Sequence, residues 1–393
     1  MKKVLLVDTN FSSFPIYNAL VDAGHQVFVV GQNPLDFLAR STPGYVQADY
    51  SDVSALKDLV SELGVDAIVP GCNDLSYRVC AELMDGEAAG LDSPAITDLL
   101  FNKRRFRRLC MDRGLPTPQL FEQGDQGWPL DRPLVVKPVD SFSGKGISIL
   151  HEPTTSVLEG ALDEARKQSR LGEALVEEYV EGQLFSHSAF IRGGRISAEV
   201  FVREYGSVNP LVVDVSYVER DFPEHLAQQL RASIEDIAGH LTICDGLMHT
   251  QFISNGERVW MIEITRRCPG DLYSRLVQHA TGMDYPAAYA GPFVGDSEIV
   301  GESEDQGRLL MRHTITQGGN CGFLAISFKL EQPFDYVPVA ISGDRLAPSP
   351  AGRVGLLFVE AEDKDGLEQL VARTREGNLY ELERLREVSA DER

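Results

Sequence analysis

The segment Leu134–Ser148, LVVKPVDSFSGKGIS, places a lysine at the end of an apolar strand and a loop rich in glycine and serine directly after it. A phosphate-binding loop of the GxxxxGK[ST] type leads from a strand into a helix. Here the loop is followed by a second apolar run, Ile147–Leu150, so the segment predicts two strands joined by the loop. The chain must therefore fold so that a strand-end lysine lies beneath a hairpin loop.

The chemistry of this segment favours a phosphate ligand. An ammonium group such as that of Lys137 at the end of a buried strand cannot be left unpaired at low cost, and a phosphate would satisfy it. The loop offers backbone N–H groups and hydroxyls, and its glycines allow close approach. The alternative is a hairpin with solvent-facing lysines. The candidate contacts are Ser141, Ser143, Gly144, Lys145 and Gly146.

Length, charge and cysteine usage limit the classes of protein to which this chain can belong. The chain has 393 residues, enough for two or three domains. Its formal net charge of −22 argues against binding nucleic-acid backbones through the whole surface, but it is compatible with a local nucleotide pocket. No apolar run reaches membrane-spanning length, and the N-terminal apolar stretch is too short for a signal peptide. The scattered cysteines form no CxxC pair, so we expect a reduced, cytoplasmic, soluble protein.

Residues 1–97 alternate strand-like and helix-like segments, which predicts an α/β domain with a doubly wound parallel sheet. Such sheets bind ligands beyond the carboxyl ends of their strands. Asn73 and Asp74 follow one predicted strand and are candidate substrate contacts. The first turn, DTNFSSFP, lacks GxGxxG, which argues against a dinucleotide-dependent oxidoreductase.

The rest of the chain predicts two further units, residues 98–295 and 296–393. The first begins near a helix capped at Ser93-Pro94 and contains α+β segments, including expected strands over 185–202 and 211–217. The second begins with an acidic linker and continues with strand-like runs and a helix near 364–374.

One predicted strand and one predicted hairpin carry acidic and amide side chains. In LVEEYV, Glu177 and Glu178 are adjacent, so one is expected to point into a site and the other towards water. Around the turn SNGE, Gln251 and Glu263 have equal parity and could lie across from each other. Oxygen-bearing side chains followed by an arginine suit a magnesium–phosphate site, although a half-exposed hairpin would show the same pattern. The oxygen-bearing set is Gln251, Glu263 and Thr265, followed by Arg267.

The order of these motifs resembles that of the ATP-grasp superfamily, whose members include biotin carboxylase, carbamoyl-phosphate synthetase, D-alanine ligase and amino-acid ligases. The resemblance covers about residues 1–295 and rests on the order and spacing of six loose motifs: a lysine in NKRRF, LPTP, a lysine in VVKP, the glycine-rich loop, EEYVEG, and paired strands ending in IEITRR.

This resemblance implies roles for the candidate residues. ATP would lie between two small sheets, with the 141–146 loop closing over its phosphates. Arg267 would face the transferred phosphoryl group. Magnesium, or manganese in its place, would be held by the oxygen-bearing set. Contacts to the phosphates are implied for Lys103 and Lys137, and contacts at the adenine for the backbone of Glu178, Tyr179 and Val180 with Glu177 nearby.

The activity implied by the resemblance is that of an ATP-dependent carboxylate–amine ligase. It would activate a small-molecule carboxylate as an acyl phosphate and join it to an amine or another nucleophile, releasing ADP and phosphate. No nucleic acid or membrane partner is implied. Residues 296–393 would either complete the active site or form a homodimer contact.

Three positions depart from the family pattern. A glutamine, Gln251, stands where the first metal carboxylate is usual, Thr265 replaces an asparagine, and Leu184 replaces a glutamate that anchors the ribose. These changes remove negative charge from the expected metal site. A catalytically degenerate nucleotide-binding protein of the same fold is therefore the main alternative to an active ligase.

Overall fold

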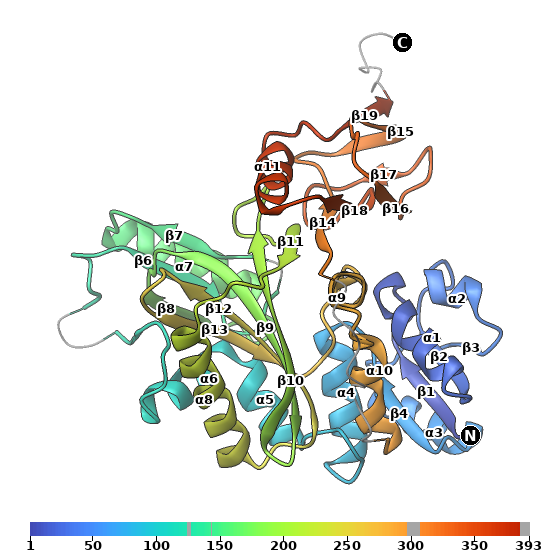
Figure 1. Ribbon diagram of the computed structural model, residues 1–393. Helices are drawn as coiled ribbons and strands as arrows, with labels where there is room; N and C mark the ends of the chain where they lie inside the picture. The colour runs from blue at the N-terminus through green and yellow to red at the C-terminus, as the bar shows by residue number, and fades with distance from the viewer. Residues whose placement is uncertain (124–126, 143, 297–306, 386–393) are drawn as a thin grey trace, which may run out of the picture.

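The computed structural model describes residues 1–123, 127–142, 144–296 and 307–385. At the N-terminus, four parallel strands form a sheet in the order β3-β2-β1-β4, which confirms the predicted doubly wound unit (Figure 1). Its elements are β1 (Lys3–Val7), α1 (Phe14–Asp22), β2 (Gln26–Gly31), α2 (Phe37–Ser41), β3 (Tyr45–Gln47), α3 (Val53–Leu63), β4 (Ala67–Pro70) and α4 (Asp74–Met84).

Local sequence signals set the ends of several helices. Asp52 accepts a hydrogen bond from the Ala55 backbone N–H and begins α3, and Gly64 ends it in the left-handed conformation. Ser93 caps α5 (Pro94–Phe101), which has proline in its first turn as expected. Asn102 accepts bonds from two backbone N–H groups of α6 (Lys103–Asp112) and so fixes where Lys103 lies.

A small antiparallel sheet contains the lysine strand and its loop. Its order is β5-β8-β6-β7, so β6 and β7 pair directly on either side of the loop. Helix α7 packs on this sheet through Leu158 and Leu162, which share an apolar cluster with Leu134. The elements are β5 (Leu120–Phe121), β6 (Leu134–Pro138), β7 (Ser148–Leu150), α7 (Thr155–Gln168) and β8 (Ala174–Glu178).

The second sheet has eight strands in the order β13-β12-β9-β10-β11-β14-β18-β16. It is larger than the small sheet that the resemblance implied. The expected strand over 211–217 is wrong for residues 211–214, because Asp214 accepts hydrogen bonds in a turn and the strand begins at Val215. The elements from this part of the chain are β9 (Gln183–Arg192), β10 (Arg195–Tyr205), β11 (Val215–Val218), α8 (Glu224–Leu241), β12 (Gly246–Ser254) and β13 (Val259–Thr265).

The C-terminal part of the chain extends the same sheet. Strand β14 pairs with β11, and β18 pairs with β14, so the main-chain ladder runs from the middle of the chain into its last quarter (Figure 1). The acidic linker lies mostly outside the described residues. The remaining elements are α9 (Tyr273–Thr281), α10 (Tyr285–Ala290), β14 (Leu309–Ile315), β15 (Cys321–Phe328), β16 (Phe334–Pro338), β17 (Arg345–Leu346), β18 (Gly355–Ala361), α11 (Lys364–Arg375), β19 (Tyr380–Leu385) and the short helical turns Phe11–Ser13 and Gly291–Val294.

The described residues form four separate sheets, the last of which is a three-stranded sheet with the order β17-β15-β19. The N-terminal unit is joined to the rest by α10, which packs on α1. The expected helix near 364–374 is present as α11, and strands accompany it. Among the described helices, none has the length and apolar composition to cross a bilayer. The domain boundaries at 97/98 and 295/296 remain a proposal, because the largest sheet continues across the second of them.

Candidate active site

Lys137 is buried in a cluster of three charged side chains. Its ammonium group contacts Glu177, whose other carboxylate oxygen accepts hydrogen bonds from Arg107 at 3.0 and 2.8 Å. All three side chains are at least 97% buried. Lys137 is thus already paired within the chain, because β8 supplies a carboxylate opposite the lysine strand. The cluster still holds two cations and one anion, so one positive charge remains for an anionic ligand.

The protonation of this cluster follows from its burial. Burial lowers the pKa of Lys137 to about 8, although the charge of Glu177 opposes the change. Burial alone would raise the pKa of Glu177, but the charges of Arg107 and Lys137 outweigh it and lower that pKa. The lysine is thus charged at neutral pH and close to losing its proton in mildly alkaline solution.

Lys103 joins the loop to the expected metal ligand. It is the first residue of α6, and its Nζ lies 2.7 Å from the Ser141 carbonyl oxygen and 2.9 Å from Glu263 Oε2. Its side chain is only 12% exposed. Lys103 therefore differs from Arg105 and Arg108 of the same KRRFRR stripe, which are mostly exposed.

The loop after β6 has the geometry of a tight flap. Ser141 Oγ donates to the Lys145 carbonyl at 2.7 Å, and both Gly144 and Gly146 have positive φ, 69° and 72°. A Cβ at Gly144 would lie 2.5 Å from the Leu211 carbonyl oxygen, so this loop approaches the backbone before β11 closely. Ser143, another candidate contact, lies outside the described residues.

The β12–β13 hairpin places Gln251 directly opposite Glu263, as the parity argument expects. The pairing depends on a bulge. From the turn to Phe252 the strands pair so that Phe252 lies opposite Met261, and Gln251 would then face Ile262. The extra residue shifts the register and brings Glu263 opposite Gln251.

Arg107 holds the bulged part of β13 in place. Its Nη1 donates to the Met261 carbonyl at 2.7 Å and its Nη2 to the Ile262 carbonyl at 3.0 Å. The same guanidinium binds Glu177, so one buried arginine ties the lysine cluster to the strand that carries Glu263. Sequence reasoning missed Arg107, because it lies within the basic run KRRFRR, in which Arg105 and Arg108 are mostly exposed.

A second residue that sequence reasoning missed is Glu204 on β10. Gln251 Nε2 donates to Glu204 Oε2 at 2.7 Å, and Glu204 is 4% exposed. Burial raises the pKa of Glu204, while hydrogen bonds from Ser186 and Gln251 and the charge of Arg312 oppose this. Gln251 stands at the position where the family has a carboxylate. The Glu204 carboxylate lies beside it, although Glu204 comes from β10, a strand far away in the sequence.

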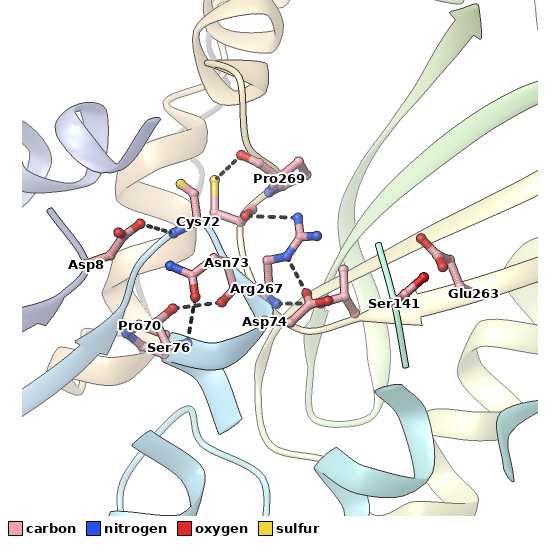
Figure 2. Close-up of polar contacts among 12 residues, drawn as sticks. Asp8, Pro70, Cys72, Asn73, Asp74, Ser76, Ser141, Glu263, Arg267 and Pro269 are labelled. Atoms are coloured by element: carbon pink, nitrogen blue, oxygen red, sulfur yellow. Dashed lines mark hydrogen bonds and ion pairs between the residues drawn. The ribbon is translucent and has the colours of Figure 1, made fainter. Parts of the chain in front are cut away.

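Arg267 contacts the N-terminal unit. Its Nε donates to Asp74 Oδ1 at 2.7 Å, so two residues singled out separately form an ion pair between β13 and α4. Figure 2 shows this pair with Cys72 and Asn73 on one side and Glu263 and Ser141 on the other. Thr265 lies two residues before Arg267, and its hydroxyl accepts a weak bond from the Arg267 backbone N–H at 3.4 Å.

The strand ends of the N-terminal sheet form a polar rim next to this pair. Asn73 caps α4, its side chain accepting from the Ser76 N–H at 2.8 Å, and also donates to Tyr50. Asp8 accepts from Ser13 and from the Cys72 N–H (Figure 2). Asn73 therefore has a structural function, whereas Asp74 pairs with Arg267.

The backbone at the end of β8, where adenine contacts are expected, already donates hydrogen bonds to other parts of the chain. Glu177 points inwards and Glu178 is half-exposed, as the strand alternation predicts. The Glu178 N–H donates to the Gln119 carbonyl at 2.9 Å and the Tyr179 N–H to Pro133 at 3.4 Å. The adenine contacts expected from the backbone of Glu178, Tyr179 and Val180 remain a prediction, and the Glu177 carboxylate is taken by Lys137 and Arg107.

Neither His187 nor His249 is placed as an acid–base group. His187 contacts Glu199 at 2.8 Å and stacks on Phe201, and burial lowers its pKa. His249 contacts Ser188 at 2.9 Å, and burial together with the Arg267 charge lowers the pKa of His249 well below its usual value. Both histidines are therefore structural.

The donor set at the hairpin suits magnesium. Glu263, Gln251 and Thr265 offer only oxygen donors from adjacent strands, and magnesium commonly uses one or two carboxylates while phosphates and water complete its octahedron. Within the described residues, no group of three or more His, Cys, Asp or Glu side chains could hold a metal ion. A site here would therefore depend on nucleotide phosphates for part of its coordination.

A cleft of about 460 Å³ lies beyond the strand ends. Its walls come from the loops after β1 and β2 and from the segments around β16 and β17. Three arginines and two aspartates line it: Arg40, Arg345, Arg353, Asp36 and Asp344. None of the residues that line this cleft belongs to the lysine cluster, but Arg353 contacts Asp271, which is close to Arg267 in the sequence.

Comparisons with known proteins agree with this arrangement. Residues 130–274 match the ATP-grasp domain family. The chain is 24% identical over 289 residues to a phosphoribosylamine–glycine ligase of Thermococcus gammatolerans, an alignment that covers 67% of this chain and 66% of that protein, just under two thirds.

Two solved structures share the fold over nearly the whole chain. An L-amino acid ligase from Bacillus licheniformis superposes with a TM-score of 0.77 at 16% identity, covering 99% of each chain. The biotin carboxylase domain of the Hydrogenobacter thermophilus 2-oxoglutarate carboxylase, solved with MgADP, has a TM-score of 0.73 at 15% identity and covers 98% of this chain and 92% of that one. These likenesses establish the fold. Lys137, the loop after it and the β12–β13 hairpin lie within the matched segment, and Lys103 precedes it. Residues 130–274 therefore match the ATP-grasp domain family, within a chain that shares the fold of these two solved structures.

Proposed function

We propose that this protein is an ATP- and magnesium-dependent ligase that joins a small carboxylic acid to an amine or another nucleophile. The observation that carries the proposal is the position of Lys103. Its ammonium group lies within 3 Å of both the flap carbonyl of Ser141 and the carboxylate of Glu263. A phosphate chain beneath the flap would thus meet two lysines and a metal ligand together.

The proposed chemistry proceeds in two steps. A carboxylate oxygen of the first substrate attacks the terminal phosphorus of ATP, the bond to the bridging oxygen breaks, and ADP leaves. The amine nitrogen then attacks the acyl carbon, phosphate leaves with the former carboxylate oxygen, and the nitrogen loses a proton. Lys103 and Lys137 would hold the phosphates, and Arg267 would face the transferred group. Catalysis is thus mainly positioning and charge neutralisation.

Magnesium held by Glu263, Gln251 and Thr265 would neutralise charge on the terminal phosphates. Lys103 pairs with Glu263 in the structure, so metal binding requires this ammonium group to move from the carboxylate towards a phosphate. The donor chemistry supports this role, and manganese, which prefers the same oxygen ligands, could replace magnesium.

The arginine-lined cleft is the proposed site of the acyl acceptor or of the carboxylate. It opens at the carboxyl ends of β1 and β2, where doubly wound sheets bind ligands. Its mixture of arginines and aspartates suits a small molecule with both an anionic group and an amine. This makes charged amino acids and anionic amines the first candidates for a substrate screen.

The test is an ATP-dependent phosphate-release screen with pairs of carboxylic acids and amines, followed by identification of the nucleotide product. We expect ADP and phosphate, with hydroxylamine trapping the acyl phosphate as a hydroxamate. Stoichiometric AMP and pyrophosphate would instead establish adenylation. Lys137→Ala should abolish the signal, and Lys167→Ala, which changes an exposed lysine on α7, should leave it intact.

The alternative is a nucleotide-binding protein without turnover. Its support is the uncharged Gln251 in the metal hairpin and the apolar Leu184 at the ribose position. Binding of MgADP without any ligase or ATPase activity across the screen would favour it.

A further inference from the structure

Glu204 lies on the same face of the large sheet as the metal hairpin. Strand β9 separates β10 from β12, and the ladders place Ser186 opposite Gln251 and Leu184 opposite both Glu204 and Ile253. Opposed residues of neighbouring strands share a face, so Glu204, Gln251 and Glu263 point to one side of the sheet.

The hydrogen bond between Gln251 and Glu204 fixes which end of the amide meets the site. Gln251 Nε2 donates to Glu204 Oε2 at 2.7 Å. A carboxylate accepts hydrogen bonds but does not donate them, so the amide nitrogen is held towards Glu204. The amide oxygen, which is the only atom of this side chain able to ligate magnesium, is therefore left for the metal.

Glu204 also supplies charge that position 251 lacks. It is 4% exposed, and within the described part of the chain no lysine or arginine lies within ion-pair distance of it. Arg312 is the cation that attracts it most, but that guanidinium donates to Ser216 and to the carbonyls of Gly270 and Asp271. A buried carboxylate without an ion pair is costly unless another positive charge approaches.

We propose that Glu204 is a positioning residue of the nucleotide–metal site: it orients the Gln251 amide oxygen towards the metal and supplies the carboxylate charge that position 251 lacks. This inference rests on the proposed function, because it requires magnesium to bind with a nucleotide beside Glu263. It explains how a chain with a neutral residue at position 251 keeps two carboxylates, Glu204 and Glu263, around that site.

Three variants separate this role from a general structural one. In Glu204→Gln, an amide faces an amide, so the charge is lost and the Gln251 orientation is no longer fixed. Gln251→Glu places two carboxylates at hydrogen-bonding distance in a buried position, where like charges oppose each other. The exchanged pair, Glu204→Gln with Gln251→Glu, restores one carboxylate–amide bond and presents a carboxylate oxygen to the metal.

The measurement is Mn²⁺ binding to the full chain with saturating ADP, followed by electron paramagnetic resonance of the free ion. ADP affinity is measured separately in EDTA, and the melting temperature of each variant is measured without ligands. We expect Glu204→Gln to weaken Mn²⁺ binding about 10–100-fold, as for other residues that orient metal ligands. ADP affinity in EDTA should not change. Gln251→Glu should melt lower than the parent without metal, and the exchanged pair should recover both the melting temperature and most of the metal affinity.

Other outcomes overturn the inference in distinct ways. Unchanged Mn²⁺ affinity in Glu204→Gln would show that Glu204 does not act on the metal. An equal loss of ADP affinity in EDTA would make Glu204 a nucleotide contact near Leu184 instead. If Glu204→Gln is too unstable to assay, failure of the exchanged pair to bind Mn²⁺ better than Gln251→Ala would be decisive. If the parent chain itself binds no ADP, the proposed function fails first.

Discussion

At the scale of single residues, the burial of Lys137 sets how the site responds to pH. Its pKa is lowered to about 8, so the lysine is charged below that value and loses its proton as the pH rises through it. The neutral form is favoured by folding, so this group alone makes the unliganded protein more stable as the pH rises from about 8 towards the usual lysine value. Phosphate binding needs the charged form of Lys137. The affinity for a phosphate ligand therefore falls as the pH rises above about 8.

We therefore predict that ADP affinity is constant below pH 8 and falls above it by up to roughly tenfold per pH unit. Calorimetric titration at pH 7 and pH 9 measures the change. Lys137→Ala should bind weakly at both values without this fall. The assignment of Lys137 to the phosphates would be wrong if the parent and Lys137→Ala showed the same slope.

A second residue-scale prediction concerns the Asp74–Arg267 pair. Asp74 holds the guanidinium from the N-terminal unit, so Asp74→Ala should leave Arg267 charged but poorly placed. Small displacements of a group at the reacting centre cost up to roughly 100-fold in rate. Turnover should fall while MgADP affinity is retained. Asp98→Ala is the control, because that acid pairs with the exposed Arg105; equal effects of the two variants would contradict the positioning role.

The functions of Arg107 and Glu204 could not be predicted from a single sequence. Both act on partners from distant strands: Arg107 on the β13 bulge and Glu204 on Gln251 across β9. Strand order in a sheet is set by packing of the whole domain and leaves no local pattern. Lys137 was identified because a lysine after two valines at a strand end is visible locally, whereas its pairing with Glu177 required the order of the small sheet.

At the scale of elements, the flap is a loop whose conformation only glycine adopts easily. Gly144 has φ of 69°, and an added Cβ would meet the Leu211 carbonyl. Gly144→Ala should therefore open or distort the flap and weaken nucleotide binding. A left-handed conformation costs about 1–2 kcal/mol for a residue with a Cβ. Measurements of ADP affinity and of melting temperature check this.

The matched control for the flap is Gly160→Ala. Gly160 lies in α7, and an added Cβ there meets nothing within 4 Å. Alanine in a helix interior is about 0.5–1 kcal/mol more stable than glycine, so this variant should melt slightly higher and bind ADP normally. Tight ADP binding by Gly144→Ala would show that the flap does not close on the nucleotide.

The β12–β13 hairpin shows which features of an element can be predicted from its own sequence. Parity about the turn predicts that Gln251 faces Glu263, and the structure agrees, but the turn occupies residues 255–258 instead of 254–257. With this turn a regular hairpin would place Gln251 opposite Ile262, and the bulge at Ile262 brings Glu263 opposite Gln251. A bulge depends on what binds its free carbonyls, here Arg107 from another helix, so the sequence of the hairpin alone does not reveal it.

At the scale of the whole molecule, the large sheet makes the C-terminal part of the chain integral to the fold. Val215 and Tyr217 of β11 share an apolar cluster with Met311 and Leu357 of β14 and β18. A chain ending at residue 295 would expose this apolar surface and the unpaired edge of β11. We predict that it aggregates or exchanges the amide hydrogens of β10 and β11 rapidly, as hydrogen-exchange mass spectrometry would show. A soluble, cooperatively melting product of that length would instead support a domain boundary at 295/296.

The overall architecture was largely accessible from sequence, because strand–helix alternation and helix caps are local signals. The joining of 309–361 to the central sheet was not, since the strands that pair, β11 and β14, are separated by almost a hundred residues. The cleft that we propose for a substrate is formed by segments from the two ends of the chain, and no motif marks it.

The central claim is that the terminal phosphoryl group of ATP is transferred to a carboxylate. The direct measurement uses the carboxylic acid that the screen identifies, labelled with ¹⁸O in its carboxylate, and analyses the released phosphate by mass spectrometry. We expect ADP together with phosphate that carries one ¹⁸O atom from the acid. Phosphate without the label would contradict an acyl phosphate intermediate, and labelled AMP would place the chemistry at the α-phosphorus instead.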